Sequence, residues 1–219
     1  EENCPEPLHT HTVIVDECGC TTESSVALLM RMDPKNLIMV GDHKQLPPTS
    51  MVPPQELKGT GHDRSLLERC VGASGSVHRL TEQYRMHEKI CQVVSTQFYN
   101  SMLQTPASVR DERQRKEKHP LIWVSVCGSE TIPPKTKSYV NYDEITAVQQ
   151  VVTKLREKHP ASSIAVLTFY KGQLQEMMRA TPASLRAEVL TVDSCQGSEF
   201  DYVVLSTVRA NRQGTIGFV

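Results

Sequence analysis

Two adjacent carboxylates, Asp16 and Glu17, directly follow the apolar residues 13–15. Three β-branched residues in succession predict a short, fully buried strand. In open α/β sheets, ligands bind at the carboxyl ends of the strands, which is where this acidic pair would lie. Adjacent acids repel each other, and Mg²⁺ prefers one or two carboxylates together with phosphate oxygens. The pair therefore predicts either a magnesium site for a phosphorylated ligand or a solvated acidic turn.

A second polar turn follows the next apolar run, which comprises residues 37–40 and predicts another buried strand. Between the two runs, residues 22–30 have the pattern of a helix that Thr or Ser caps and that an Asp-Pro pair ends. The order of strand, acidic turn, helix, strand and polar turn is that of a βαβ unit in a parallel sheet. This second turn carries Asp42 and Gln45.

The remainder of the chain continues the alternation of helices and strands. It predicts an α/β fold with parallel sheets flanked by helices, in two domains that comprise residues 1–76 and 77–219. The mixed-charge run 110–118 predicts a solvated linker or an exposed helix, and residues 49–64 predict a surface loop. The other expected elements are helices at 65–71, 88–99 and 143–158, a helix ending near 179, and strands at 77–80, 121–126, 164–168, 189–192 and 202–208.

Cysteine usage gives an expectation about the cellular compartment. The chain has seven cysteines, an odd number, and no C-x-x-C pair. This pattern predicts free thiols in a reducing environment, so we expect an intracellular protein, either cytoplasmic or nuclear. A zinc site formed by Cys18, Cys20, His9 and His11 is disfavoured because their spacing matches no common zinc motif.

The overall composition disfavours several classes of protein. No apolar run approaches the roughly 18 residues needed to span a membrane and no signal peptide is evident, so we expect no membrane partner. The net charge of −1 provides no global basic field, and any nucleic-acid surface must therefore be local. No G-x-G-x-x-G follows a predicted strand, which disfavours a dinucleotide-binding oxidoreductase.

Four ordered motifs lie at the predicted strand ends and together carry a family resemblance. They read VIVDE at 13–17, GDHKQLPP at 41–48, QYRMH at 83–87 and TVDSCQGSEFDYVVLSTVRAN at 191–211. The first is weak alone, whereas the others are increasingly specific. In this order they resemble the superfamily 1 helicases, and more narrowly the up-frameshift-like group, which includes the RNA helicase of nonsense-mediated decay. The resemblance covers nearly the whole chain, from residue 13 to residue 219.

This resemblance implies two RecA-like domains of the P-loop NTPase fold, the first incomplete, with ATP and Mg²⁺ bound between them. Single-stranded nucleic acid would cross their top, with RNA favoured over DNA. Asp16 would hold the metal, and Glu17 would orient and activate the attacking water. Gln45 would sense the γ-phosphate and the water, because an amide can donate to one and accept from the other. Asp42 is expected either to cap its turn or to take part in catalysis.

The QYRMH motif would supply two residues from the opposing domain. Arg85 resembles an arginine finger that meets the γ-phosphate when the cleft closes, a role that suits a planar, permanently charged fork. Tyr84 would stack on the adenine base of ATP, and the alternative is that its ring packs in the core.

The resemblance also assigns residues near the end of the chain. Gln196 and its neighbours would couple the ATP site to the nucleic-acid path, with Gly197 allowing close backbone approach. Glu199 would contact the ribose or a neighbouring arginine. Arg209 is expected in the nucleotide site, or with Asn211 in a salt bridge or turn. The expected contacts with nucleic acid or with the nucleotide edge are Gln196, Thr168, Tyr170 and Gln173.

Two departures from the family pattern leave a second function open. No stretch matches the Walker A loop, G-x-x-x-x-G-K-[ST], which the family places upstream of Asp16. The family also carries a further catalytic arginine beyond residue 219. The alternative to an ATP-driven helicase is therefore a non-hydrolysing module that binds nucleic acid or protein, and we expect residues 1–219 alone to be inactive. A first domain without its leading strands should expose sheet edge and core.

Overall fold

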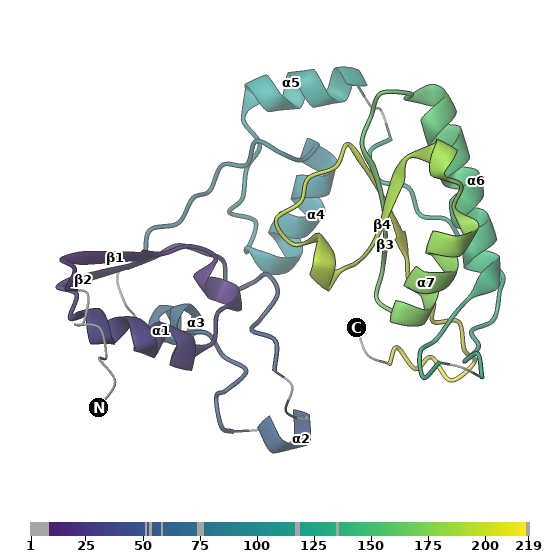
Figure 1. The fold of residues 1–219 in the computed structure, drawn as a ribbon. Coiled ribbons are helices and arrows are strands. Elements are labelled where there is room, and N and C mark those ends of the chain that lie inside the picture. The colour runs from purple at the N-terminus through teal and green to yellow at the C-terminus, as the bar shows by residue number, and fades with distance from the viewer. Residues whose placement is uncertain are drawn as a thin grey trace. The chain divides into compact units, whose positions relative to one another are not determined.

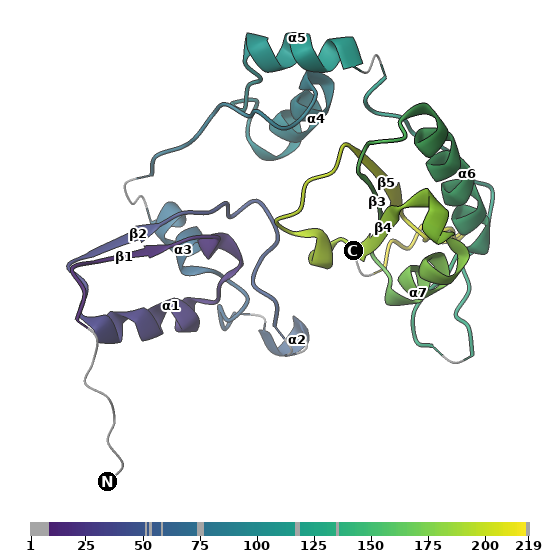
Figure 2. The same ribbon diagram turned by 45° about the horizontal axis from the view of Figure 1, so that its top comes forward.

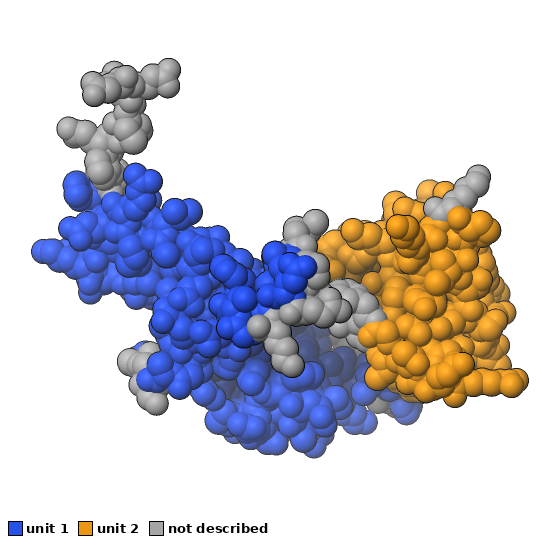
Figure 3. Space-filling model, turned by 90° about the horizontal axis from the view of Figure 1, so that it is seen from below, with its two compact units in different colours: residues 1–122 blue, residues 123–219 orange. Residues whose placement is uncertain are grey.

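The computed structural model describes residues 9–50, 52, 54–57, 59–73, 77–116, 119–134 and 136–217 (Figures 1 and 2). Contacts divide the chain into two compact units, Glu1–Ile122 and Trp123–Val219 (Figure 3). The domain limit expected between residues 76 and 77 lies inside the first of these units, and it stays a prediction.

The first unit contains the βαβ arrangement expected from the sequence. Strands β1 (Thr12–Val15) and β2 (Asn36–Met39) pair in parallel, with Val15 opposite Met39 at their carboxyl ends. The chain between them forms α1 (Glu23–Leu29), and the side chain of Thr22 caps this helix by accepting from the Ser25 amide. Two 3₁₀ turns flank the helix, η1 (Cys18–Cys20) and η2 (Met30–Met32).

The prediction that both of these strands are fully buried is wrong. Their residues alternate between half-buried and exposed, and the side chain of Ile14 is 66% exposed. The reason is that the described residues give this sheet only two strands, with α1 and α3 (Leu66–Gly72) lying on one side of the pair (Figure 1). The open apolar face, which includes Ile38, agrees with the expectation that the first domain exposes part of its core.

The other regular elements described in the first unit are helices, and one predicted strand is missing. Residues 77–80 are exposed and belong to no ladder, and the side chain of Leu80 is 94% exposed. A strand needs a hydrogen-bonded partner, and none pairs with this segment among the described residues. Beyond α3, the helices are α2 (Pro54–Leu57) within the expected loop, α4 (Glu88–Phe98) where a helix was expected, and α5 (Ala107–Lys116) over the mixed-charge run.

The second unit is built on a three-stranded parallel sheet of order β4-β3-β5. The prediction that residues 121–126 form a further strand is wrong, because this segment pairs with no described strand and Trp123 is 87% exposed. The observed elements are α6 (Tyr142–Lys158), β3 (Ile164–Thr168), α7 (Lys171–Ala180), η3 (Ala183–Leu185), β4 (Ala187–Thr191), η4 (Asp193–Cys195) and β5 (Tyr202–Ser206).

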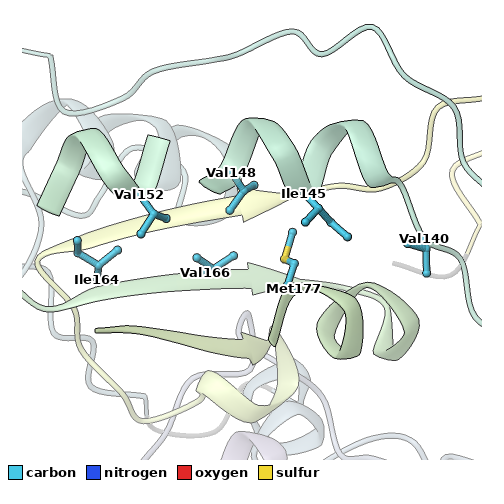
Figure 4. Close-up of a cluster of buried hydrophobic side chains, with 7 residues drawn as sticks. All are labelled: Val140, Ile145, Val148, Val152, Ile164, Val166 and Met177. Atoms are coloured by element: carbon cyan, nitrogen blue, oxygen red, sulfur yellow. The ribbon is translucent and has the colours of Figure 1, made fainter. Parts of the chain in front are cut away.

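The core of this unit lies between the central strand and two helices, as Figure 4 shows. The side chains that α6 directs at the sheet, those of Ile145, Val148 and Val152, repeat at helical spacing along the sequence. Met177 of α7 joins the same cluster, so both helices cover the same face of the sheet. Asn141 fixes the start of α6 by accepting from the Glu144 amide at 3.1 Å. The buried cluster comprises Val140, Ile145, Val148, Val152, Ile164, Val166 and Met177.

Candidate nucleotide site

The turns that follow β1 and β2 are interlocked through their backbones. The Cys18 amide donates to the Val40 carbonyl at 2.9 Å. A Cβ atom added to Gly19 would lie 2.5 Å from the Asp42 carbonyl oxygen, and one added to Gly41 would lie 2.9 Å from the amide of Cys18. Such distances are too short for any side chain, so glycine is required where the turns touch. The structure thus brings the acidic pair and the Asp42–Gln45 turn to the same edge of the sheet.

Asp16 and Glu17 are both exposed at this edge. Glu17 adopts a left-handed backbone, with φ 49° and ψ 35°, and its amide donates to Asp16 Oδ1 at 2.9 Å. Few residues other than glycine adopt this conformation, and it recurs at functional sites. The hydrogen bond uses one carboxylate oxygen of Asp16 and orients the group, which fits a single protein ligand for Mg²⁺ alongside phosphate oxygens and waters.

Asp42 is the most heavily hydrogen-bonded side chain of the second turn. Its Oδ1 accepts from the Lys44 amide at 2.9 Å, and its Oδ2 accepts from Gln45 Nε2 at 3.1 Å and from the Tyr99 hydroxyl at 2.5 Å. Partial burial opposes ionisation, but the bonds from Tyr99, Lys44 and Gln45 together hold the pKa of Asp42 below its usual value. Asp42 therefore caps its turn, which is one of the two roles expected for it. No sequence motif pointed to Tyr99.

The QYRMH turn carries Tyr84 and Arg85, and the side chain of Gln83 holds its backbone. Gln83 Oε1 accepts from the amides of Arg85 at 2.9 Å and Met86 at 2.6 Å. Its Nε2 donates to the Met86 carbonyl at 2.9 Å and to Thr105 Oγ1 at 2.7 Å. This buried amide fixes the backbone that carries Arg85. Sequence reasoning missed Gln83, and its place at the start of the motif was the available signal.

Tyr84 lies at the surface, with 62% of its area exposed, so the alternative that it packs in the core is wrong. Its hydroxyl donates to Glu82 Oε2 at 2.8 Å, and this bond raises the pKa of Tyr84. The ring is therefore accessible for stacking. His87 then caps α4, because its Nδ1 accepts from the Lys89 amide at 3.1 Å.

In the second unit, the loop between η4 and β5 exposes Gln196, Gly197 and Glu199. Gly197 has φ +80°, and no atom lies within 4 Å of the position that its Cβ would take. Only glycine adopts this backbone readily, and the open space leaves room for close approach of a ligand. The role expected of Gly197 in coupling the ATP site to the nucleic-acid path stays a prediction.

Arg209 makes the salt bridge that was one of its two expected roles. Its Nε donates to Glu130 Oε2 at 2.9 Å, and its guanidinium lies 4.2 Å from the centre of the Tyr139 ring. The bond to Glu130 raises the pKa of Arg209, and the same bond lowers that of Glu130. Asn211 Nδ2 also donates to Glu130, at 3.2 Å. Glu130, which the sequence did not single out, thus holds the VRAN segment.

Thr168, Tyr170 and Gln173 are all buried in the second unit. Gln173 accepts from the Asn141 amide at 2.8 Å and donates to Ser206 Oγ at 3.1 Å. The hydroxyl of Tyr170 donates to the Ile216 carbonyl at 3.3 Å. These contacts are internal to the fold, and the nucleic-acid contacts expected of Thr168 and Tyr170 stay predictions.

Three observations concern only the described part of the chain. No group of three or more His, Cys, Asp or Glu side chains there could hold a metal ion. The cysteines found there, at 18, 20, 70, 91, 127 and 195, are free. Within the same residues, no helix combines the length and apolar character that crossing a membrane requires.

Comparison with known proteins agrees with these features. One AAA domain family model matches residues 62–219, and a second AAA domain model matches residues 5–52. Regulator of nonsense transcripts 1 of Dictyostelium discoideum is 31% identical over 222 residues, which cover 94% of this chain and 16% of that protein. ATP-dependent helicase NAM7 of Saccharomyces cerevisiae is 30% identical, covering 95% of this chain and 23% of the relative. The human 3'-5' exoribonuclease HELZ2 is 36% identical, and the match covers 92% of this chain and 7% of that protein.

The chain therefore belongs to the AAA domain family, with an α/β fold of the RecA-like type. Within that family it groups with the superfamily 1 helicases of the up-frameshift-like type, as the four motifs indicated. It spans less than a quarter of the length of each relative named above.

Proposed function

We propose that the full-length protein carrying this chain hydrolyses ATP at the carboxyl edge of β1 and β2 and uses the reaction to move along single-stranded nucleic acid. The observation that carries this proposal is the interlock of Gly19 and Gly41, which sets the acidic pair beside the Asp42–Gln45 turn. A yeast relative named as an ATP-dependent helicase supports the same conclusion.

The residues of the β1–β2 edge divide the chemistry of phosphoryl transfer among them. Asp16 would hold Mg²⁺, and the bound ion would neutralise charge on the phosphates. Glu17 would orient the attacking water and accept its proton. Gln45 would donate to the γ-phosphate and accept from the water, since its amide offers both functions. Asp42, which already accepts three hydrogen bonds, holds Gln45 instead of contacting the substrate.

The QYRMH turn would complete the nucleotide site. Arg85 would stabilise the negative charge that develops on the γ-phosphate, and Gln83 holds its backbone for that role. The exposed ring of Tyr84 would stack on adenine. In the second unit, the residues proposed to bind the nucleotide are Gly197, Glu199 and Arg209. The salt bridge to Glu130 would orient Arg209.

The nucleic-acid partner is a single strand, with RNA favoured over DNA. The name of one relative, regulator of nonsense transcripts, supports RNA. The proposed contact in this chain is Gln196, which lies in an exposed loop. The test is ATP turnover by the full-length protein with matched RNA and DNA oligonucleotides. We expect both to stimulate turnover and RNA to stimulate it more. Equal turnover with and without nucleic acid would contradict the proposal.

A second candidate function is a non-hydrolysing module that binds nucleic acid or protein. It is favoured by one observation, the lack of a G-x-x-x-x-G-K-[ST] match within these 219 residues. Such a module would bind nucleotide weakly or not at all. Titration of residues 1–219 with a fluorescent ATP analogue tests this, and micromolar affinity would count against the module.

A further inference from the structure

Helix α4 connects two parts of the proposed site within the first unit. Its first turn is capped by His87, which directly follows the turn that carries Tyr84 and Arg85. Its other end is followed by Tyr99, whose hydroxyl donates to Asp42 Oδ2 at 2.5 Å. The helix has 11 residues. A helix of that length spans about 16 Å and behaves as one rigid rod. The proposed arginine finger and the turn after β2 are thus joined by a single element.

The Asp42 carboxylate transmits this contact to Gln45. Oδ2 of Asp42 accepts both from Tyr99 and from Gln45 Nε2, the latter at 3.1 Å, while Oδ1 is held by the Lys44 amide. Gln45 is itself exposed, and an exposed glutamine loses conformational entropy when it is held in one rotamer. The bond to a carboxylate that is fixed from two other sides supplies the restraint.

At neutral pH, Asp42 and Tyr99 have the protonation states that their hydrogen bond requires. Hydrogen bonds hold the pKa of Asp42 below its usual value, so this carboxyl is ionised. Burial and the bond to Asp42 raise the pKa of Tyr99, so its hydroxyl keeps its proton and donates. Bonds between a hydroxyl and a carboxylate are short and stronger than those between neutral groups.

We propose that Tyr99 is a positioning residue: through Asp42 it holds Gln45 in place for the γ-phosphate and the attacking water. Helix α4 then couples the position of the Tyr84–Arg85 turn to that of Gln45. This inference rests on the function proposed above, because Gln45 has a γ-phosphate to sense only if the protein binds and hydrolyses ATP. It adds a residue that touches no substrate and is remote from the turn in sequence.

The test replaces Tyr99 by phenylalanine in the full-length protein, which keeps the ring and removes only the hydroxyl. We expect kcat for ATP to fall about tenfold while KM changes less than about twofold, because positioning acts on the transition state more than on binding. Tyr142→Phe is the matched control, since this tyrosine is exposed on α6. It should leave kcat unchanged.

A double-mutant cycle separates positioning from a general loss of structure. Gln45→Ala should lower kcat, and Tyr99→Phe added to it should cause no further loss, because the residue that Tyr99 positions is gone. All four proteins are assayed well below their melting temperatures. Wild-type kcat in Tyr99→Phe, or losses that multiply in the double variant, would overturn the inference while leaving the proposed function intact. A wild-type protein without ATPase activity would instead refute the proposed function and, with it, this inference.

Discussion

Tyr99 donates a 2.5 Å hydrogen bond to Asp42, which lies 57 residues earlier in the chain. The same oxygen of Asp42 accepts from the side-chain amide of Gln45. This shared acceptor links the end of α4 to the turn after β2. Gln45, the residue proposed to sense the γ-phosphate, is therefore held by a contact outside its own motif.

The close contact between the turns after β1 and β2 predicts that Gly19 tolerates no side chain. In Gly19→Ala, the new Cβ would lie 2.5 Å from the Asp42 carbonyl oxygen, and both partners are backbone atoms that cannot rotate away. We expect a loss of about 1–3 kcal/mol in the free energy of unfolding, the usual cost of overpacking. The measurement is the thermal unfolding midpoint of the full-length protein.

Gly72→Ala is the control for that substitution. Gly72 lies at the end of α3, and nothing is within 4 Å of the position that its Cβ would take. Alanine should therefore be neutral or stabilise the helix by about 0.5–1 kcal/mol. Equal midpoints for the two variants would show that the turns do not interlock as described.

Because the side chain of Gln83 holds the QYRMH turn, we predict that Gln83→Ala lowers both stability and ATP turnover. The substitution removes four hydrogen bonds and leaves the amides of Arg85 and Met86 without their acceptor. Leaving a buried polar group unsatisfied costs about 1–3 kcal/mol. We expect a lower unfolding midpoint together with reduced ATP turnover, because the Arg85 backbone is released.

Gln150→Ala, on the exposed side of α6, is the matched control for Gln83→Ala. A surface substitution of this kind should change stability by no more than about 0.5 kcal/mol. If Gln83→Ala matches this control in both midpoint and turnover, Gln83 does not support the turn.

The Glu130–Arg209 pair predicts a pH-dependent contribution to stability. The hydrogen bond from Arg209 holds the pKa of Glu130 below its usual value. A carboxylate with a lowered pKa in the folded state stabilises the fold above its unfolded pKa, about 4.3, and loses this effect as the pH falls through the folded value. Glu130→Gln should therefore lower the melting temperature at pH 7, and the gap to wild type should shrink below about pH 4.

A gap of constant size from pH 7 to pH 3 would contradict that account of Glu130. The control is Glu157→Gln, on the exposed side of α6, which should follow the wild-type curve at every pH.

Elements with a strong local signal were predictable from the sequence. The limits of β3 agree with the structure, because residues 164–167 are all apolar and follow a turn that contains Pro160. Helix α6 was predictable because Ile145, Val148 and Val152 repeat at helical spacing and all three are buried. The parallel pairing of β1 and β2 followed from the βαβ order of the sequence.

What could not be predicted depends on partners far away in the chain. Residues 77–80 and 121–126 have strand composition, yet they pair with no described strand, and pairing is a property of the whole sheet. For the same reason Ile14, in an apolar run, is exposed. Tyr99 and Glu130 belong to no motif, and their roles depend only on the partners that folding brings to them.

Glu17 is the residue proposed to activate water for ATP hydrolysis. This role is tested by comparing ATP turnover by the wild-type full-length protein with that of Glu17→Gln, in the presence of single-stranded RNA. The amide keeps the size of the side chain and removes its ability to accept a proton. We expect turnover to fall at least about a hundredfold, with the affinity for a fluorescent ATP analogue retained. Unchanged turnover in Glu17→Gln would contradict the role assigned to the acidic pair.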